Sequence, residues 1–238
     1  MKRKIVRWIS ERLRQAGARG VVLGLSGGVD SGVVAALAKE AVGKKCLLAL
    51  ILPIHSQAQD LRDARLIAGK LGIQTKLIDL SKIYDNLIKA LPKAGKAVQA
   101  NLKPRLRMLA LYYYANKLNY LVCGTGNKAE LTVGYFTKYG DGGVDILPIG
   151  DLLKSQVRKL ARDLGIPDRI IAKSPTAGLW PGQTDEGEMG LFYPELDNIL
   201  ELKEKNKKQV LPRIKVAKVE GMIAKSAHKR EAPRICFI

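Results

Sequence analysis

The chain has few aromatic residues, few cysteines and no long apolar run, and each shortage excludes a class of protein. Phe, Trp and Tyr make up 5% of the 238 residues, and there are three cysteines. The longest uninterrupted apolar run covers residues 46–54, well short of the roughly 18 residues that a membrane-spanning helix needs. We therefore expect a globular protein with no membrane span.

The cysteines indicate neither a disulfide framework nor a metal site. Cys46, Cys123 and Cys236 are far apart and odd in number, and no CxxC pair is present. Cys46 and Cys123 lie in apolar runs, so we expect both to be small core residues. The basic N-terminus resembles that of a signal peptide, but Arg7 and Glu11 interrupt the stretch that would have to be apolar. These features predict a reducing, cytoplasmic location.

Acidic residues are scarce relative to basic ones. The 41 Lys and Arg against 22 Asp and Glu give a formal net charge of +19, which favours polyanionic partners. Nucleic acid is one possibility, but the chain has no RNA-recognition signature or zinc finger, and its basic residues are spread over the whole length. We expect phosphate-rich small molecules as ligands, with no nucleic-acid or membrane partner.

Apolar runs alternate with amphipathic stretches along the chain. Strand-like runs lie at residues 21–25, 46–52, 76–78 and 120–123. Helical spacing is found before the first strand, at residues 32–42, 61–71, 102–118 and 152–164, and after Pro194. This pattern predicts a single α/β domain over residues 1–238, with a doubly wound, mostly parallel sheet and helices on both faces. Residues 136–145 and 174–190 break the pattern, which is typical of functional loops.

The strongest local motif follows the first strand and reads Gly24-Leu25-Ser26-Gly27-Gly28-Val29-Asp30-Ser31. Its two central glycines allow a tight turn close to an anion, and the N-terminus of the following helix faces the phosphates. Bare phosphate would repel Asp30, so the motif implies an intervening cation, most simply Mg²⁺. The motif is neither a Walker loop nor the three-glycine dinucleotide fingerprint.

This loop resembles the pyrophosphatase-type loop of NAD synthetases, GMP synthetases, asparagine and argininosuccinate synthetases and several tRNA-modifying enzymes. These enzymes cleave ATP between its α and β phosphates and adenylate an oxygen atom. The motif therefore indicates the reaction class but not the acceptor.

A second block of sequence points to the acceptor. It reads Gly124-Thr125-Gly126-Asn127-Lys128-Ala129-Glu130, then Gly134-Tyr135-Phe136-Thr137-Lys138-Tyr139-Gly140-Asp141-Gly142-Gly143-Val144-Asp145, and ends at Asp151-Leu152-Leu153-Lys154. In residue type and spacing the block resembles the ammonia-dependent NAD synthetases, and together with the first loop the resemblance covers essentially the full chain.

The resemblance implies an adenine nucleotide alpha hydrolase-like fold and a specific reaction. ATP would adenylate the nicotinate carboxylate of deamido-NAD, and ammonia would then displace AMP to give NAD, AMP and pyrophosphate. Mg²⁺ would be the cofactor, and no protein nucleophile is needed. The resemblance also implies a homodimer that binds deamido-NAD across its interface.

The resemblance also assigns site residues. The ATP site would be formed by Gly24, Leu25, Ser26, Gly27, Gly28, Val29, Asp30, Ser31, Thr125, Lys154 and Thr176. The Mg²⁺ ligands would be Asp30 and Glu130. Deamido-NAD would be bound by Arg105, Lys138, Asp145, His228 and Lys229. Thr176 lies in a stretch, residues 174–186, that resembles the mobile loop of the family and whose polar, Gly- and Pro-rich sequence suits a lid.

Several alternatives stay open at this point. An ATP pyrophosphatase acting on tRNA is compatible with the charge of +19, and a nucleotide-binding module without activity is compatible with the loop alone. Glutamine-dependent relatives carry a large additional amidase domain with a Cys nucleophile, whereas this chain begins shortly before its first strand. We therefore expect free ammonia as the nitrogen source, with delivery by a separate glutaminase chain as the alternative. For the homodimer we expect the first helix, with Ile5, Ile9 and Leu13, and parts of residues 102–118 to bury apolar faces against a second subunit, although packing within the chain explains the spacing equally well.

Overall fold

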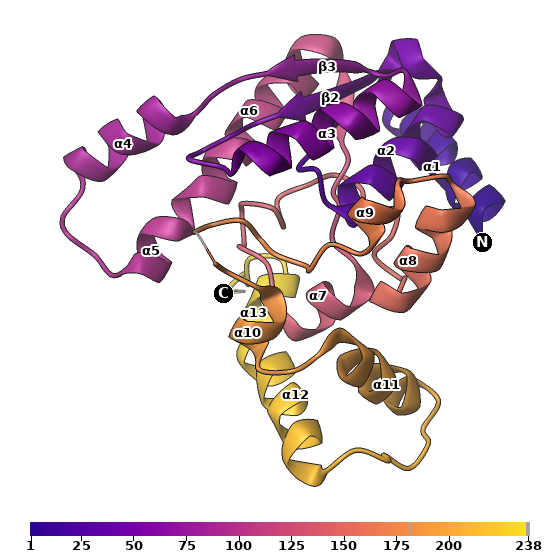
Figure 1. Cartoon of the computed structure of the whole chain (residues 1–238), viewed down its shortest axis with the longest axis vertical. Coiled ribbons are helices and arrows are strands. Elements are labelled where there is room, and N and C mark those ends of the chain that lie inside the picture. Colours follow the sequence, from indigo (N-terminus) through magenta and orange to yellow (C-terminus); the bar gives the residue numbers. More distant parts are fainter. Residues whose placement is uncertain (181, 237–238) are drawn as a thin grey trace.

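The computed structural model describes residues 1–180 and 182–236 and contains a parallel sheet near one end of the molecule (Figure 1). Its strands are β1 (Gly20–Gly24), β2 (Leu47–Ile51), β3 (Gln74–Leu77) and β4 (Tyr120–Val122). All three pairings in the order β3-β2-β1-β4 are parallel. The chain runs outward from β1 to β3 and returns to β4 on the other side of β1, so ligands are expected at the carboxyl ends of β1 and β4. The four predicted strands are confirmed.

Helices connect and surround these strands. The first half of the chain contains α1 (Lys2–Ala16), α2 (Val29–Val42), the 3₁₀ turn η1 (Lys44–Cys46), α3 (Ala58–Leu71), α4 (Ser81–Ala90), α5 (Lys96–Ala100) and α6 (Leu102–Leu118). The second half contains α7 (Lys128–Val133), α8 (Lys154–Asp163), α9 (Asp168–Ile171), α10 (Asp185–Met189), α11 (Tyr193–Glu204), α12 (Arg213–Lys225) and α13 (Ala227–Arg230). All the predicted helices are present, whereas α4, α5, α7, α9 and α10 were not predicted. Every described helix is too short or too polar to cross a lipid bilayer.

Alternation along the strands places one core on each face of the sheet. Val21 and Leu23 of β1 pack with α1, α2, α3 and α8 on one face. Val22 between them points to the other face, where it packs with Leu80, which precedes α4, and with Ala115 of α6. Because side chains in a strand point alternately to its two faces, a near-continuous apolar strand must be covered twice. The predicted doubly wound architecture is confirmed.

The apolar face of α1 is buried within its own chain. Ile9 and Leu13 are 0% and 7% exposed and pack against the sheet core, and Ile5 is partly buried there. Burial of Ile9 and Leu13 against a second subunit is therefore wrong, because the amphipathic face is already covered by α2 and its neighbours. Two large apolar side chains on α6 are exposed to solvent: Leu109 is 59% and Tyr113 is 61% exposed.

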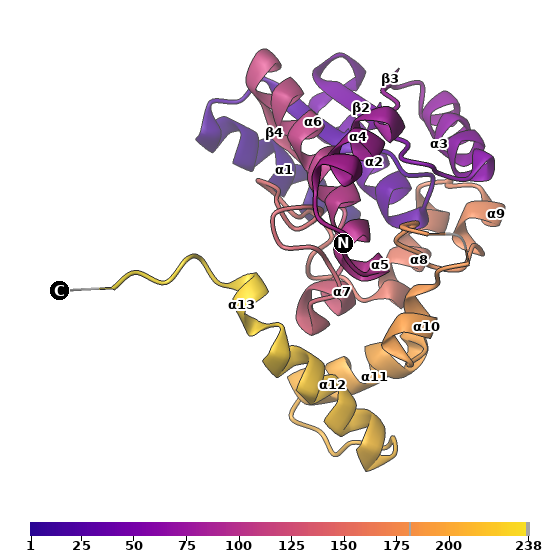
Figure 2. The ribbon, with the colours of Figure 1, turned by 90° about the vertical axis from the view of Figure 1, so that its left-hand side faces the viewer.

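A third apolar cluster joins α7, α10, α11 and α12, which form the lower part of the molecule (Figure 1). After α13 the described residues 231–236 lead away from the body (Figure 2). Residues 136–145 form the predicted irregular loop. The prediction for residues 174–190 is wrong in part, because α10 begins there: Thr184 caps it by accepting a hydrogen bond from Gly187 N at 3.1 Å.

Only one of the two cysteines predicted for the core is fully buried. Cys123 follows β4 and is 1% exposed, whereas Cys46 ends η1 and is only partly buried. Burial in apolar surroundings raises the pKa of the Cys123 thiol far above its ordinary value. This thiol is therefore protonated and packs as a small apolar side chain.

Candidate active site

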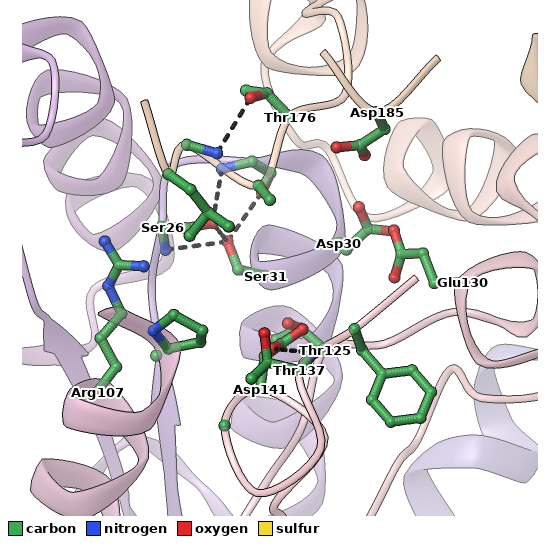
Figure 3. Close-up of a pocket in the computed structure, with 18 of the residues that line it drawn as sticks. Ser26, Asp30, Ser31, Arg107, Thr125, Glu130, Thr137, Asp141, Thr176 and Asp185 are labelled. Atoms are coloured by element: carbon green, nitrogen blue, oxygen red, sulfur yellow. Dashed lines mark hydrogen bonds between the residues drawn. The ribbon is translucent and has the colours of Figure 1, made fainter. Parts of the chain in front are cut away.

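A cavity of about 450 Å³ opens at the carboxyl ends of β1, β2 and β4 (Figure 3). Its walls are the loop after β1, the start of α6, the loop after β4, and residues 174–180, which we call the lid segment. The lining includes the following residues expected from the sequence: Gly24, Leu25, Ser26, Gly28, Val29, Asp30, Ser31, Thr125, Glu130, Lys154, Thr176 and Lys229. Segments far apart in the sequence thus form one site, at the edge where ligands of such sheets bind.

The loop after β1 is held tightly by its two serines. The Ser31 hydroxyl donates to the Gly28 carbonyl at 2.9 Å, and the hydroxyls of Ser26 and Ser31 lie 3.1 Å apart. Gly27 has φ +83°, and a Cβ there would lie 2.5 Å from the Asp60 carbonyl. Only glycine therefore allows the loop to pass so close to α3, and α2 can begin at the cavity wall, where its free N–H groups can bind an anion.

A buried ammonium and two carboxylates meet beside this loop. Lys154 Nζ lies 2.5 Å from Asp30 Oδ2 and 3.6 Å from Glu130 Oε1, and the lysine side chain is only 2% exposed. Burial alone would lower the pKa of Lys154, but the charges of Asp30 and Glu130 outweigh burial and raise it. Asp30 and Glu130, the carboxylates expected to bind the metal, thus already face the positively charged Lys154 ammonium.

Asn127 connects the two carboxylates and was not predicted as a site residue. Its Nδ2 donates to Asp30 Oδ1 at 3.3 Å, and its Oδ1 accepts from Glu130 N at 3.1 Å. The Asn127 N–H in turn donates to Glu130 Oε2 at 3.1 Å, which completes a capping box at the start of α7. The sequence signal was available, since an N-cap residue followed three positions later by Glu is the capping-box spacing.

Behind these groups, Tyr193 links Glu130 to Asp185. The tyrosine hydroxyl lies 3.2 Å from Glu130 Oε1 and 3.1 Å from Asp185 Oδ2. Burial raises the pKa of Glu130 to about 7, with Lys154 lowering it and Asp30 raising it further. Asp185, which begins α10, was not predicted as a site residue, and its location among the other carboxylates is visible in Figure 3.

Asp141 is a further carboxylate in the cavity wall that the sequence did not single out (Figure 3). Its Oδ1 accepts the Thr137 N–H at 2.9 Å, and no salt bridge to it is formed among the described residues. Burial in the cavity wall raises its pKa, against the effect of the Thr137 N–H and of the Arg107 and Lys229 cations. A carboxylate without a bonded cation is suited to bind a small cation from solution.

The lid segment is fixed at its base. Lys173, which precedes it, forms salt bridges to Asp60 at 2.7 Å and Asp63 at 3.0 Å, both on α3. Within the segment, the Thr176 hydroxyl accepts from Gly178 N at 3.1 Å. Thr176 lines the cavity, and its contact with ATP stays a prediction.

The residues expected to bind deamido-NAD are divided between two places. Lys229 lines the cavity, and its Nζ donates to the carbonyls of Gly134 and Phe136 at 2.7 and 2.8 Å. Arg105 donates to the Lys138 carbonyl at 3.4 Å, and the Lys138 ammonium donates to the carbonyl of His228. Arg105, Lys138 and His228 lie outside the cavity lining.

Asp145 also lies outside the cavity lining. Its carboxylate accepts from Val122 N at 2.7 Å and from the Tyr112 hydroxyl at 3.0 Å. In this arrangement Asp145 joins the loop before it to the end of β4 and to α6. Binding of deamido-NAD by Asp145 stays a prediction.

Comparison with known proteins agrees with this geometry. The model of the NAD synthase family matches residues 1–233. The chain belongs to the NAD synthase family. An NH₃-dependent NAD⁺ synthetase of Archaeoglobus fulgidus is 51% identical over 241 residues, which cover 99% of this chain and 97% of that protein.

Two solved structures of the family are similar over the whole length. NMN synthetase from Francisella tularensis has a TM-score of 0.92 and 38% identity, covering 100% of this chain and 97% of that one. NH₃-dependent NAD synthetase from Campylobacter jejuni, in complex with the nitrate ion, has a TM-score of 0.87 and 32% identity, covering 99% and 97%. Membership of the NAD synthase family therefore agrees with both the fold and the cavity.

Proposed function

We propose that the chain is an ammonia-dependent NAD synthase that amidates deamido-NAD at the expense of ATP. The observation that supports this proposal best is the cavity that brings the phosphate loop after β1 together with Glu130 and Lys154. A non-enzymatic nucleotide-binding module would not need two partly buried carboxylates around a buried ammonium, because burying charges is costly unless they serve binding or chemistry.

In the first step the nicotinate carboxylate attacks the α-phosphorus of ATP, and the bond to pyrophosphate breaks. The N–H groups at the start of α2 and the hydroxyls of Ser26 and Ser31 would hold the phosphates. Lys154 supplies a positive charge to the leaving pyrophosphate. Catalysis then comes from positioning and charge neutralisation, and no side chain is needed as a nucleophile.

The residues around Lys154 fit a Mg²⁺ ion. Asp30 and Glu130 supply the hard oxygen donors that Mg²⁺ prefers, and they would hold the ion beside the Lys154 ammonium, which both carboxylates already face. No group of three or more acidic, His or Cys ligands is assembled among the described residues. Bound Mg²⁺ would neutralise phosphate charge, and Asn127 would keep both carboxylates in place.

In the second step ammonia attacks the adenylated carbonyl carbon, AMP leaves, and the nitrogen loses a proton. Asp141 lines the cavity and forms no salt bridge among the described residues, which also holds for Asp185 and Glu188, and we propose that Asp141 attracts ammonium. The lid segment would exclude water, which would otherwise hydrolyse the adenylate.

Binding of deamido-NAD by Arg105, Lys138, Asp145, His228 and Lys229 is also part of the proposal. The first two and the last two meet where α13 packs on the loop before residue 140. We propose that the chain forms a homodimer, since exposed Leu109 and Tyr113 lie one turn apart on α6 and give this helix an apolar outer strip. Sedimentation that finds an active monomer at micromolar concentration would refute the dimer.

A second acceptor is worth testing, because the Francisella relative is an NMN synthetase. The purified chain should be incubated with ATP, Mg²⁺ and ammonium, with deamido-NAD, nicotinate mononucleotide or tRNA as acceptor. We expect amide formation and equimolar AMP with deamido-NAD, and a lower kcat/KM with the mononucleotide. Preference for the mononucleotide, or turnover with tRNA alone, would contradict the proposal.

A further inference from the structure

The tip of the lid segment, Leu179 and Trp180, is held by a buried lysine near the start of α6. Lys103 is 6% exposed, and its Nζ donates to the Leu179 carbonyl at 2.7 Å. The same ammonium lies 5.3 Å from the centre of the Tyr84 ring. Lys103 is absent from the cavity lining, so its bonding atom is directed at the lid and not at the ligand space.

A second lysine contacts the same tip. Lys96 of α5 places its Nζ 4.7 Å from the centre of the Trp180 ring, within the range of a cation–π interaction. The base of the lid segment is closed separately, by the hydrogen bond from Asp185 N to the Pro175 carbonyl at 3.0 Å. The base and the tip are therefore attached to different parts of the fold, the base to the start of α10 and the tip to α5 and α6.

The chemistry of the Lys103 contact suits an attachment that must open. No carboxylate forms a salt bridge with Lys103 among residues 1–180 and 182–236, so its ammonium contacts a neutral carbonyl and an aromatic ring in the closed lid, and the Asp85 charge acts on it from a longer distance. Burial lowers the pKa of Lys103, and Arg107 lowers it further. Opening the lid would return the ammonium to water, which offsets part of the cost of breaking the contact.

From these contacts we propose that Lys103 is a positioning residue that latches the lid segment over the ATP site by bonding the Leu179 carbonyl, with Lys96 as a weaker second contact. Closure keeps Thr176 in the cavity wall and keeps water from the adenylated carboxylate. The exclusion of water from the adenylated carboxylate rests on the proposed function, whereas the contact between Lys103 and the lid segment does not.

The test compares Lys103→Met, which removes the charge and the donor but keeps the length of the side chain, with Lys117→Met at the exposed far end of α6. The chain has two tryptophans, so replacing Trp8 by Phe leaves Trp180 as the only fluorescent reporter on the lid. Acrylamide quenching of Trp180 and amide exchange of residues 174–180 measure opening without any turnover. Lys96→Ala, at an exposed site, provides a second variant that does not disturb the core.

We expect Lys103→Met to raise the quenching of Trp180 and to speed amide exchange of the lid segment about tenfold, the factor that a 1.4 kcal/mol change gives. Lys96→Ala should have a smaller effect in the same direction, and Lys117→Met none. Lid opening in Lys103→Met should also let water reach the adenylate, so that more AMP than NAD is released per turnover.

Wild-type quenching and exchange in Lys103→Met would overturn the latch, whatever happens to activity. Faster exchange together with an unchanged ratio of AMP to NAD would overturn the role in excluding water. Absence of any NAD formation by the wild-type chain would refute the proposed function alone, because the lid measurements do not depend on it.

Discussion

Lys154 Nζ lies 2.5 Å from Asp30 Oδ2, although the two residues are 124 positions apart in the sequence. Asp30 follows β1 and Lys154 begins α8, and the parallel pairing of β1 with β4 brings the following segments to the same edge of the sheet. The fold thus joins the phosphate loop to the block of sequence that ends at Lys154, and the charges that meet there lead to the first prediction.

Asp30→Asn and Glu130→Gln should each lower kcat/KM by at least ~100-fold, the usual effect of removing a group that stabilises charge in a transition state. Both substitutions keep the shape of the side chain, so the far-UV circular dichroism spectrum should not change. Steady-state kinetics at saturating Mg²⁺ check this, with the exposed Asp163→Asn as the control. Wild-type turnover in either site variant would remove the metal assignment.

Asp63 gives a pH-dependent contribution to stability. Burial raises its pKa, but hydrogen bonds from Lys173 and Gln59 and the charges of Lys173 and Arg169 outweigh burial and lower it below 3.8. A lowered pKa in the folded state means stability that is present above about pH 3.8 and is lost as the pH falls through the lowered value.

Asp63→Asn should therefore lower the free energy of unfolding at pH 7 by about 1–3 kcal/mol, since it leaves Arg169 without its carboxylate partner and Lys173 with Asp60 alone. Below pH 3.8 the difference from the wild type should shrink. Urea unfolding at pH 7 and at lower pH measures both effects. A difference that stays constant with pH would mean that the carboxylate charge is not the stabilising feature.

Gly134→Ala should detach the C-terminal segment. Gly134 has φ +73°, and a Cβ there would lie 2.1 Å from Ser226 Cβ. Gly165 has φ +70° with nothing within 4 Å of its Cβ position, so Gly165→Ala reports the backbone strain alone. We expect Gly134→Ala to lose ~1–3 kcal/mol more stability than the control, the usual cost of overpacking. Equal losses in urea unfolding would show that α13 does not pack tightly there.

Lys138→Ala and Lys229→Ala should raise the KM for deamido-NAD much more than the KM for ATP. Both lysines lie where α13 meets the loop after α7, and each loss should be roughly 1.5–3 kcal/mol, typical of a charge-assisted hydrogen bond. Initial rates with each substrate varied in turn provide the measurement. Unchanged kinetics together with loss of salt-sensitive tRNA binding would favour the tRNA alternative.

Local patterns account for what could be predicted from the sequence. The phosphate loop and the block from Gly124 to Lys154 are continuous motifs, and the strands are apolar runs, so both could be recognised without long-range information. The bounds of α6 were predicted to the residue, because apolar residues recur at helical spacing from Leu102 to Leu118.

Long-range contacts account for what was missed. The spacing on α1 reveals an apolar face but not what covers it, so Ile9 and Leu13 could be assigned to either of two interfaces. Lys103 looks like an ordinary surface lysine until the fold brings Leu179, 76 positions later, to its ammonium. In the sequence, Asp141 is one more residue of the block from Gly124 to Lys154. Only the fold shows that it lines the cavity and, unlike Asp30 and Glu130, forms no salt bridge among the described residues.

Asp141→Asn should weaken the use of ammonium and leave the adenylation step intact. In the wild type the Thr137 N–H donates to Asp141 Oδ1 at 2.9 Å. Asparagine keeps an oxygen that can accept this hydrogen bond, so the loop should keep its conformation. The lost charge should raise the KM for ammonium ~10-fold or more at fixed pH, as expected for a charged hydrogen-bond partner.

Two half-reactions separate this role from a general loss of activity. ATP–pyrophosphate exchange with deamido-NAD in the absence of ammonium reports adenylation, and the ammonium dependence of NAD formation reports the second step. Because burial raises the pKa of Asp141, its charge is gained only above that raised value, so the advantage of the wild type over the variant should grow as the pH rises through it. Impaired exchange with an unchanged KM for ammonium would instead assign Asp141 to binding of ATP or of the acceptor.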